Sequence, residues 1–338
     1  MKKKVVVIGG GTGTYSVLSG LKKYGNQVDV TAIVAMTDSG SSTGRLRDEL
    51  GALPVGDVRM ALLALGDESR IDNHTLRELF LYRFQKGGEG LRGHNFGNLL
   101  LVALSEVMGS ELSAIEVVSR MFNIHGCVLP VSTESLTLVA QYEDGSEVVG
   151  EKDIDVPPDG WVEKSISNIE VRPRGVLTPG VREALLNADV IILGPGDLYT
   201  SLLAAVLVGE MRELIQKSPA QFIYIGNLMS KWGQTTGYNS ATYIKEIEKY
   251  TGRAPGTMFI NTTSFPPDAL TRYTAIGEHP VEDTGSDNTS TVVIRGDFVA
   301  TEEVTRATGD TYKRSLIRHD AEKLSSALMA YFDTLTDV

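Results

Sequence analysis

The segment from Val5 to Thr14 constrains the fold most, because a strand-like run there meets a glycine-rich turn. Val5 to Ile8 is short, apolar and β-branched, which is typical of a buried strand. A helical pattern of apolar residues follows the turn. A strand, a tight glycine turn and a helix together favour anion binding, since glycine lets the backbone approach closely and the helix start offers unpaired N–H groups. The sequence therefore predicts phosphate or nucleotide binding at Gly9, Gly10, Gly11, Thr12, Gly13 and Thr14.

The turn matches the dinucleotide fingerprint G-x-G-x-x-G imperfectly, because Thr14 stands where the third glycine belongs. The alternative interpretation is a tight turn between strand and helix with no ligand, which many α/β proteins have. The turn alone does not name its ligand.

Composition narrows the classes of partner and compartment. The formal net charge of −11 over 338 residues argues against nucleic acid and anionic membranes as partners. The single cysteine, Cys127, excludes an internal disulfide framework, and the apolar run at 202–208 is too short to span a bilayer. We therefore expect a cytoplasmic protein without membrane insertion. Self-association into a homo-oligomer is left open.

A second polar loop follows the apolar run at 28–35, which predicts another buried strand. Asp38 lies where such a strand carries an acid for a ribose hydroxyl, and the same carboxylate could hold Mg²⁺ beside phosphates. Ser39 and Arg45 belong to a Ser/Gly-rich segment that could meet an anion, the alternative being a solvated loop. Asp57 is a further carboxylate candidate, or it caps the helix that follows.

A polar, glycine-flanked patch at 93–98 leads into an apolar helix. His94 and Asn98 are four residues apart, so we expect them on one helical face. They could bind polar ligand groups, and His94 could act as an acid or base; a buried histidine with satisfied hydrogen bonds is the alternative.

Two more apolar runs, at 188–193 and 221–225, end in polar glycine-bearing loops, and the spacing of later apolar residues predicts helices that cover a sheet. Four such strand ends indicate an open, mainly parallel Rossmann-like sheet whose crevice binds the ligand.

Runs at 136–142 and 147–149 predict a β-hairpin. We expect a single α/β domain over 1–338, with a small hairpin-containing, irregular insertion around 130–175. The candidate ligand residues in the later loops are Gly194, Gly196, Asp197, Thr200 and Asn227.

The loops taken together resemble the YvcK/CofD-like family. It comprises bacterial gluconeogenesis factors of the YvcK type and the 2-phospho-lactate transferases of deazaflavin-coenzyme synthesis. The motifs that carry the resemblance are GGGTG at 9–13, TDSGSSTGRLR at 37–47, GDVR at 56–59, GHNFGNLLL at 93–101, LPVS at 129–132, GPGDLYTS at 194–201 and NLMSKWGQTTGY at 227–238. The last motif resembles the YvcK branch more than the transferase branch.

The resemblance implies a CofD-like, Rossmann-like fold that binds a nucleotide or nucleotide-sugar. For the YvcK branch it implies UDP-sugars and a regulatory role in carbon metabolism and cell shape. For the transferase branch it implies transfer of a guanylyl-activated phospholactate with Mg²⁺, for which Asp38, Asp57 and Asp197 are candidate metal ligands and Asp38, Asp57 and His94 candidate catalytic groups. The sequence departs from the family pattern at Ser39, Met60, Asp197, Trp232 and Gln234.

Three hypotheses follow from these patterns. The first is a nucleotide-sugar-binding regulatory protein. The second is a phosphotransferase-type enzyme that uses Mg²⁺. The third, an NAD(P)-binding oxidoreductase, has only the glycine turn in its favour and lacks the complete fingerprint.

Overall fold

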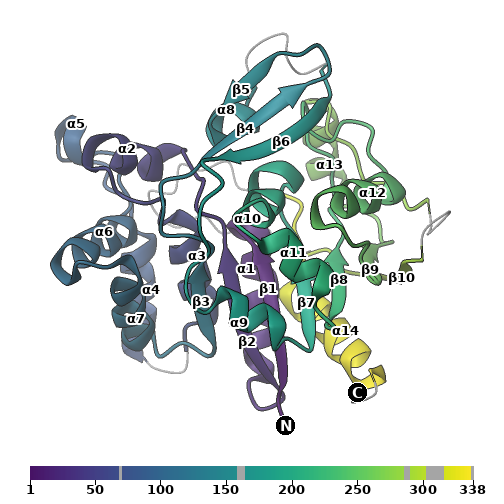
Figure 1. Cartoon of the computed structure of the whole chain (residues 1–338), viewed down its shortest axis with the longest axis horizontal. Coiled ribbons are helices and arrows are strands. Elements are labelled where there is room, and N and C mark those ends of the chain that lie inside the picture. Colours follow the sequence, from purple (N-terminus) through teal and green to yellow (C-terminus); the bar gives the residue numbers. More distant parts are fainter. Residues whose placement is uncertain (68–70, 158–163, 285–289, 302–315, 336–338) are drawn as a thin grey trace.

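A computed structural model describes residues 1–67, 71–157, 164–284, 290–301 and 316–335 of the chain. Its centre is a seven-stranded sheet in the order β10-β9-β8-β7-β1-β2-β3, in which every pairing is parallel (Figure 1). The strands are β1 (Lys3–Gly9), β2 (Val28–Val34), β3 (Cys127–Pro130), β7 (Val190–Leu193), β8 (Gln221–Ile225), β9 (Thr257–Asn261) and β10 (Val292–Gly296). The predicted parallel α/β sheet is thereby confirmed, and all four predicted strands lie in it.

The two strands at the middle of the sheet, β1 and β7, place the functional site. Val5 of β1 is in register with Val30 of β2 on one side and with Val190 of β7 on the other. The chain proceeds from β1 outward through β2 and β3, then returns to β7 and proceeds outward the other way. Such a reversal opens a crevice at the carboxyl ends of the two strands, where open α/β sheets bind their ligands.

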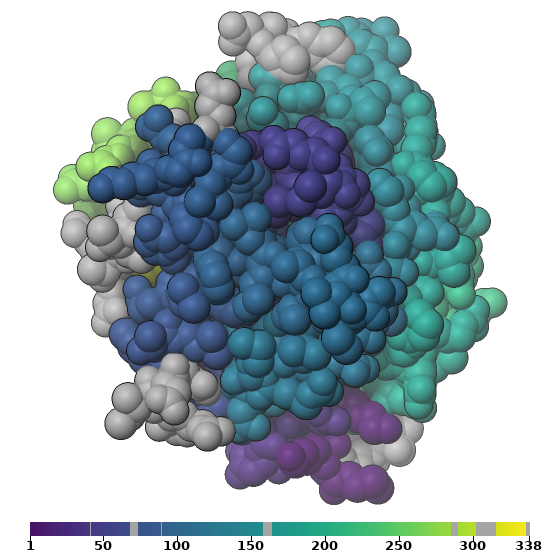
Figure 2. All heavy atoms as spheres, turned by 90° about the vertical axis from the view of Figure 1, so that its left-hand side faces the viewer, coloured from purple at the N-terminus to yellow at the C-terminus, as the bar shows by residue number. Residues whose placement is uncertain are grey.

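Helices surround the sheet and form a lobe beside its β3 edge. The lobe consists of α2 and α4 to α7, and Figure 2 shows its outer face, largely covered by residues of α4 to α7. The helices are α1 (Gly11–Leu21), α2 (Ser41–Leu50), α3 (Gly56–Leu65), α4 (Ile71–Leu81), α5 (Gly88–Leu91), α6 (Phe96–Met108), α7 (Glu111–Phe122), α8 (Glu151–Asp155), α9 (Val181–Leu186), α10 (Ala204–Val206), α11 (Met211–Lys217), α12 (Ser240–Thr251), α13 (Pro267–Thr274) and α14 (Ala321–Thr334), with a 3₁₀ turn η1 (Lys22–Tyr24) and a π-helical turn η2 (Leu198–Leu203).

Helix α1 is fixed from both sides. It contacts α3 and α14, and a Cβ atom on Gly20 would overlap the backbone of Ala321 at the start of α14. Glycine at this position therefore lets the helix that begins at the glycine turn lie directly against the last helix of the chain.

A separate antiparallel sheet, β5-β4-β6, lies between β3 and β7 in the sequence. Its strands are β4 (Thr137–Tyr142), β5 (Glu147–Val149) and β6 (Ile166–Arg172). The pairing of β4 with β5 is the hairpin that the sequence predicts, and β6 adds a third strand. Helix α8 directly follows β5, and Figure 1 shows this unit above the main sheet. No helix among the described residues has the length and apolar character needed to cross a membrane.

Candidate functional site

A cleft with a volume of about 580 Å³ lies at the crevice between β1 and β7. That volume lies within the usual range of small-ligand sites. Three of the predicted loops supply much of its wall, and α13 and the segment before α14 supply most of the rest. The predicted ligand residues that line it are Gly10, Gly11, Thr12, Gly13, Gly196, Asp197 and Asn227. The structure thus brings the glycine turn and two distant loops together.

The glycine turn is backed by a carboxylate from α3. The Gly11 backbone N–H, at the start of α1, donates to Asp57 Oδ1 at 2.8 Å. A Cβ atom on Gly10 would overlap the same carboxylate. Asp57 thereby satisfies one of the free N–H groups at the start of α1 from behind the turn, so its predicted role as a cap of its own helix is not what the structure shows.

The glycine turn at 9–14 packs directly against a second glycine turn, at 194–196. A Cβ atom on Gly13 would overlap the Pro195 carbonyl. The Thr14 hydroxyl donates to the same carbonyl at 3.4 Å, and the side chain is buried. Thr14 therefore joins the two turns instead of lining the cleft.

Asn227 fixes the second turn from the third loop. Its Nδ2 donates to the Gly196 carbonyl at 2.8 Å, and its Oδ1 accepts from the Tyr224 hydroxyl at 2.6 Å. Gly9, Gly194 and Thr200 are also buried in this region, but they do not line the cleft. Their contribution is to the shape of the turns.

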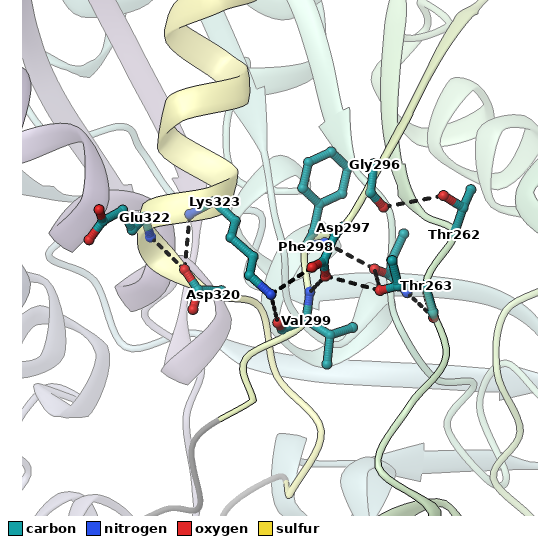
Figure 3. Close-up of polar contacts among 10 residues, drawn as sticks. Thr262, Thr263, Gly296, Asp297, Phe298, Val299, Asp320, Glu322 and Lys323 are labelled. Atoms are coloured by element: carbon teal, nitrogen blue, oxygen red, sulfur yellow. Dashed lines mark hydrogen bonds and ion pairs between the residues drawn. The ribbon is translucent and has the colours of Figure 1, made fainter.

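The segment 316–319, which the sequence analysis does not single out for the site, forms another wall of the cleft. It pairs with the end of the 296–300 segment, since the Ala300 N–H donates to the Arg318 carbonyl at 3.0 Å. Figure 3 shows the contacts that hold the 296–300 segment to α14: Lys323 Nζ donates to Asp297 Oδ2 at 2.7 Å and to the Val299 carbonyl at 2.9 Å. The network places Arg318 and His319 at the cleft.

His319 is an uncharged group in this wall. Burial lowers its pKa to about 4, against the opposing effect of a hydrogen bond with the Gly226 backbone. Its Nε2 atom is buried and has no hydrogen-bond partner in the part of the chain described. A neutral imidazole here can donate or accept one hydrogen bond, depending on its tautomer.

A group that we call the lysine cluster comprises Lys231, Asp197, Asp155 and Glu278. Lys231 Nζ lies 3.1 Å from Asp155 Oδ1 and 3.6 Å from Asp197 Oδ2. Burial disfavours the charged form of Lys231, but Asp197 and Asp155 outweigh burial and raise its pKa. Burial raises the pKa of Asp197 and of Glu278, while Lys231 opposes both shifts. Lys231, Asp197 and Glu278 line the cleft, and Asp155 lies behind them.

A second group, the inner acid group, comprises Asp38, Asp57 and Glu151 and does not line the cleft. Burial raises the pKa of Asp57 to about 7, and the neighbouring Asp38 charge adds to the shift. Burial raises the pKa of Glu151 to about 8, with Asp38 and Asp155 as further causes. The pKa of Asp38 is raised for the same reason, although the Gly40 N–H and other groups oppose the shift.

Ser39 connects the inner acid group to the small sheet. Its backbone N–H donates to Glu151 Oε2 at 3.3 Å, and its Oγ accepts from the Lys152 N–H at 2.9 Å. The departure from the family pattern at Ser39 thus coincides with a contact to α8, which supplies a carboxylate beside that position.

Arg45 lies on α2, which begins at Ser41, so the segment predicted as an anion-binding or solvated loop is helical from there onward. A Cβ atom on Gly44 would overlap the Ser39 backbone, so glycine lets this helix fold back onto the loop before it. The Arg45 guanidinium donates to the Arg92 carbonyl at 2.7 Å, and Arg45 does not line the cleft.

The expected placement of His94 and Asn98 on one helical face is wrong. Helix α6 begins at Phe96, and the Asn95 side chain caps it by accepting from the Asn98 N–H, so His94 precedes the helix. His94 is buried, with Nδ1 3.1 Å from Ser42 Oγ, and burial lowers its pKa. Asn98 accepts from Arg59 Nε at 2.8 Å. Both side chains belong to an interior network that reaches the inner acid group through Thr43.

Several residues of the cleft were missed by the sequence analysis as ligand candidates. Those that carry charge or a large side chain include Lys231, Arg272, Tyr273, Ile276, Glu278, Arg318 and His319. Lys231 lies within the motif at 227–238, which could have flagged it. The others belong to α13, the turn after it and the last segment, where no local motif marks them. Tertiary packing alone brings them to the cleft.

The chemistry of the donor groups decides whether the site fits Mg²⁺. Asp38 and Asp57 each already accept a backbone N–H, from Gly40 and Gly11 respectively. No set of three or more Asp, Glu, His or Cys side chains in the described ranges is arranged to hold a metal ion. Mg²⁺ keeps several waters and often binds one or two carboxylates together with substrate phosphates. These residues therefore fit Mg²⁺ only as an ion that binds together with phosphates.

Comparison with known proteins identifies the class that this fold and cleft define. The family model described as 2-phospho-L-lactate transferase CofD matches residues 5–299. The chain therefore belongs to the CofD family, as its motifs indicate.

Within that family the chain is similar to proteins named gluconeogenesis factor. It is 40% identical over 332 residues to the one from Listeria innocua, covering 97% of this chain and 95% of the relative. It is 36% identical over 336 residues to the one from Bacillus subtilis, covering 97% and 98%. A crystal structure of a Bacillus halodurans protein superposes with a TM-score of 0.87 at 34% identity, covering 97% of this chain and all of that one.

Proposed function

We propose that the protein binds a nucleotide-sugar, of the UDP-sugar class, and acts as a regulator of carbon metabolism and cell shape. The observation that carries the proposal is the cleft at the crevice between β1 and β7, where the glycine turn and two further loops meet. Helix starts bind phosphates through their backbone N–H groups, and Thr12 and Gly13 at the start of α1 line the cleft. Arg272 and Arg318 supply positive charge to the same cleft of an acidic protein.

The cleft also offers an apolar surface for a base. Ile276 and Leu316 line it and are exposed by 59% and 36%, and Tyr273 lies beside them. Aromatic and aliphatic side chains are the usual lining of small-ligand sites, with a few polar groups that set orientation. The role in carbon metabolism is supported by the relatives named gluconeogenesis factor, and the role in cell shape by the family resemblance of the motifs alone.

The test is direct measurement of binding. We expect saturable, one-to-one binding of UDP-glucose or UDP-N-acetylglucosamine in calorimetry, and mass spectrometry of the native protein should detect a UDP-sugar that co-purifies. A guanine nucleotide or NAD in place of the UDP-sugar would overturn the proposal in favour of one of the alternatives below.

A phosphotransferase of the CofD type is the second candidate, favoured by the name of the family model and by the two carboxylates behind the glycine turn. Asp38 and Asp57 would then hold Mg²⁺ together with the substrate phosphates, which requires the phosphates to reach behind the glycine turn, since neither carboxylate lines the cleft. Steady multiple turnover of phospholactate transfer by the purified protein, lost in Asp57→Asn, would support this candidate over a binding protein. The NAD(P) oxidoreductase hypothesis has no support beyond the glycine turn.

A further inference from the structure

The lysine cluster joins three parts of the chain at the wall of the cleft. Asp155 ends α8 of the small sheet unit, Asp197 belongs to the second glycine turn, and Lys231 belongs to the loop after β8. Gln234 Nε2 lies 3.4 Å from both Asp155 Oδ1 and the Ile154 carbonyl, which ties the same loop to α8. The position of the Lys231 ammonium is therefore set by residues outside the cleft as well as inside it.

Trp232 holds the fourth member in place. A Cβ atom on Gly277 would overlap the Trp232 ring, and the positive φ of +79° also favours glycine there. The Glu278 carboxylate accepts a hydrogen bond from the Trp232 backbone N–H. The departure from the family pattern at Trp232 is thus accommodated by a glycine and brings an extra carboxylate into the cluster.

The balance of charge in the cluster distinguishes two kinds of ligand. One ammonium is shared by three carboxylates, so the cluster is negative when all four groups are ionised. A terminal phosphate placed there would meet carboxylates at short range and be repelled. A neutral polyhydroxyl group would instead donate hydrogen bonds to the carboxylate oxygens and accept one from the ammonium. Positive charge from Arg272 and Arg318 enters the cleft from α13 and from the 316–319 segment.

We propose that the lysine cluster is the specificity element of the cleft. It selects a diphosphate that is capped by a neutral sugar, and it rejects a ligand that ends in a free phosphate. In this arrangement the diphosphate lies at the glycine turn and the sugar hydroxyls lie against Asp197, Glu278 and Lys231. Asp155 is a positioning residue that acts through Lys231. It binds the ammonium from behind, so that the ammonium does not cancel the negative charge of the carboxylates that face the cleft. The inference rests on the proposed function, since it names which end of the ligand each part of the site binds.

The test compares UDP-glucose, UDP and UTP as ligands of the full chain in calorimetry without Mg²⁺. The wild type should bind UDP-glucose at least about tenfold more tightly than UTP, a difference of 1.4 kcal/mol. Asp155→Asn keeps the size and the acceptor oxygen but removes one negative charge, so UTP should bind roughly fivefold more tightly, with little change for UDP-glucose. Glu278→Gln should move the ratio in the same direction, which provides a second variant if the first is unstable.

Asp153→Asn is the matched control, because Asp153 is an exposed residue on the same helix. It should leave all three affinities unchanged. If the wild type binds uridine nucleotides but neither Asp155→Asn nor Glu278→Gln changes the ratio of affinities, the specificity inference is overturned and the proposed function stands. If the wild type binds none of the three ligands, the proposed function fails and the inference fails with it.

Discussion

The inner acid group and the lysine cluster flank the same glycine turn, and burial raises carboxyl pKa values in both, but the lysine cluster places an ammonium among its carboxyls. In the inner acid group burial dominates, and the pKa values of Asp57 and Glu151 rise to about 7 and 8. In the lysine cluster an ammonium lies within 3.6 Å of two carboxylates. The first group holds loops of the protein to each other, and the second faces the cleft. Exposure to the cleft, more than residue type, separates a structural acid from one available to a ligand.

The largest effect is expected when a methyl group fills the space between the glycine turn and the Asp57 carboxylate of the inner acid group. Gly10→Ala places a methyl group on the Asp57 carboxylate, so we expect the free energy of unfolding to fall by about 3 kcal/mol. The measurement is urea unfolding. Adding Asp57→Ser should recover much of the loss, whereas Gly90→Ala, where a Cβ atom would meet nothing within 4 Å, should change little. Equal losses at both glycines would contradict the packing described.

The pH dependence of stability should report the inner acid group. The pKa of Glu151 is about 8 in the folded protein and 4.5 for the free side chain. Between these values the folded state retains a proton that the unfolded state has released, so rising pH weakens the fold. Glu151→Gln should therefore be more stable than the wild type by about 2 kcal/mol near pH 9, and by much less near pH 5. Glu106→Gln, at an exposed position on α6, should show no such dependence, and a pH-independent gain at Glu151 would contradict the assignment.

Removing the Lys231 ammonium tests the role of the lysine cluster in ligand binding. Lys231→Met leaves Asp155, Asp197 and Glu278 uncompensated beside the cleft, so UDP-glucose should bind more weakly by about 1.5 kcal/mol. Calorimetry measures the change, and raising the salt concentration should reduce it. Lys245→Met on the exposed face of α12 is the control. Unchanged affinity in Lys231→Met would place the ligand away from the lysine cluster.

The smallest effect is expected at Arg45. The loop pattern alone favours a phosphate contact there, with a loss of roughly 1.5–3 kcal/mol on truncation. In the structure the guanidinium instead bonds to the Arg92 carbonyl and lies 3.7 Å from Glu49. Arg45→Ala should therefore change nucleotide affinity by about 0.5 kcal/mol or less. A larger loss in calorimetry would mean that α2 moves toward the ligand.

The central strands could be predicted from sequence because they are buried on both faces and read as continuous apolar runs. Residues of β1 and β7 show this clearly, and both end at glycine turns. Strand β10 could not be predicted, because it lies at the sheet edge and its residues are only partly buried. The Ser/Gly-rich composition of the segment favours a loop, because Ser and Gly are poor helix formers; α2 forms because its residues pack against other parts of the chain, as Gly44 does against Ser39.

Some residues of the site could likewise be predicted from the sequence, and others could not. Gly10 to Gly13, Gly196, Asp197 and Asn227 could be found because backbone turns at strand ends have a local sequence signature. Arg272, Glu278 and Arg318 could not, because nothing near them in the sequence marks them and long-range packing brings them to the cleft. Thr14 and His94 show the converse error, since a suitable residue type near a motif turned inward to the protein interior.

The contact between Gly20 and the start of α14 has a consequence for how the protein is made. The cleft is lined by residues 10–13 and by residues 316–319, so two of its walls come from segments that are synthesised at widely separated times. Helix α1 has no partner on its α14 side until the segment at 321–334 has left the ribosome. The central strands can pair earlier. Every strand of the main sheet precedes the 316–319 segment in the chain, so the cleft can be completed only after the whole sheet has been synthesised.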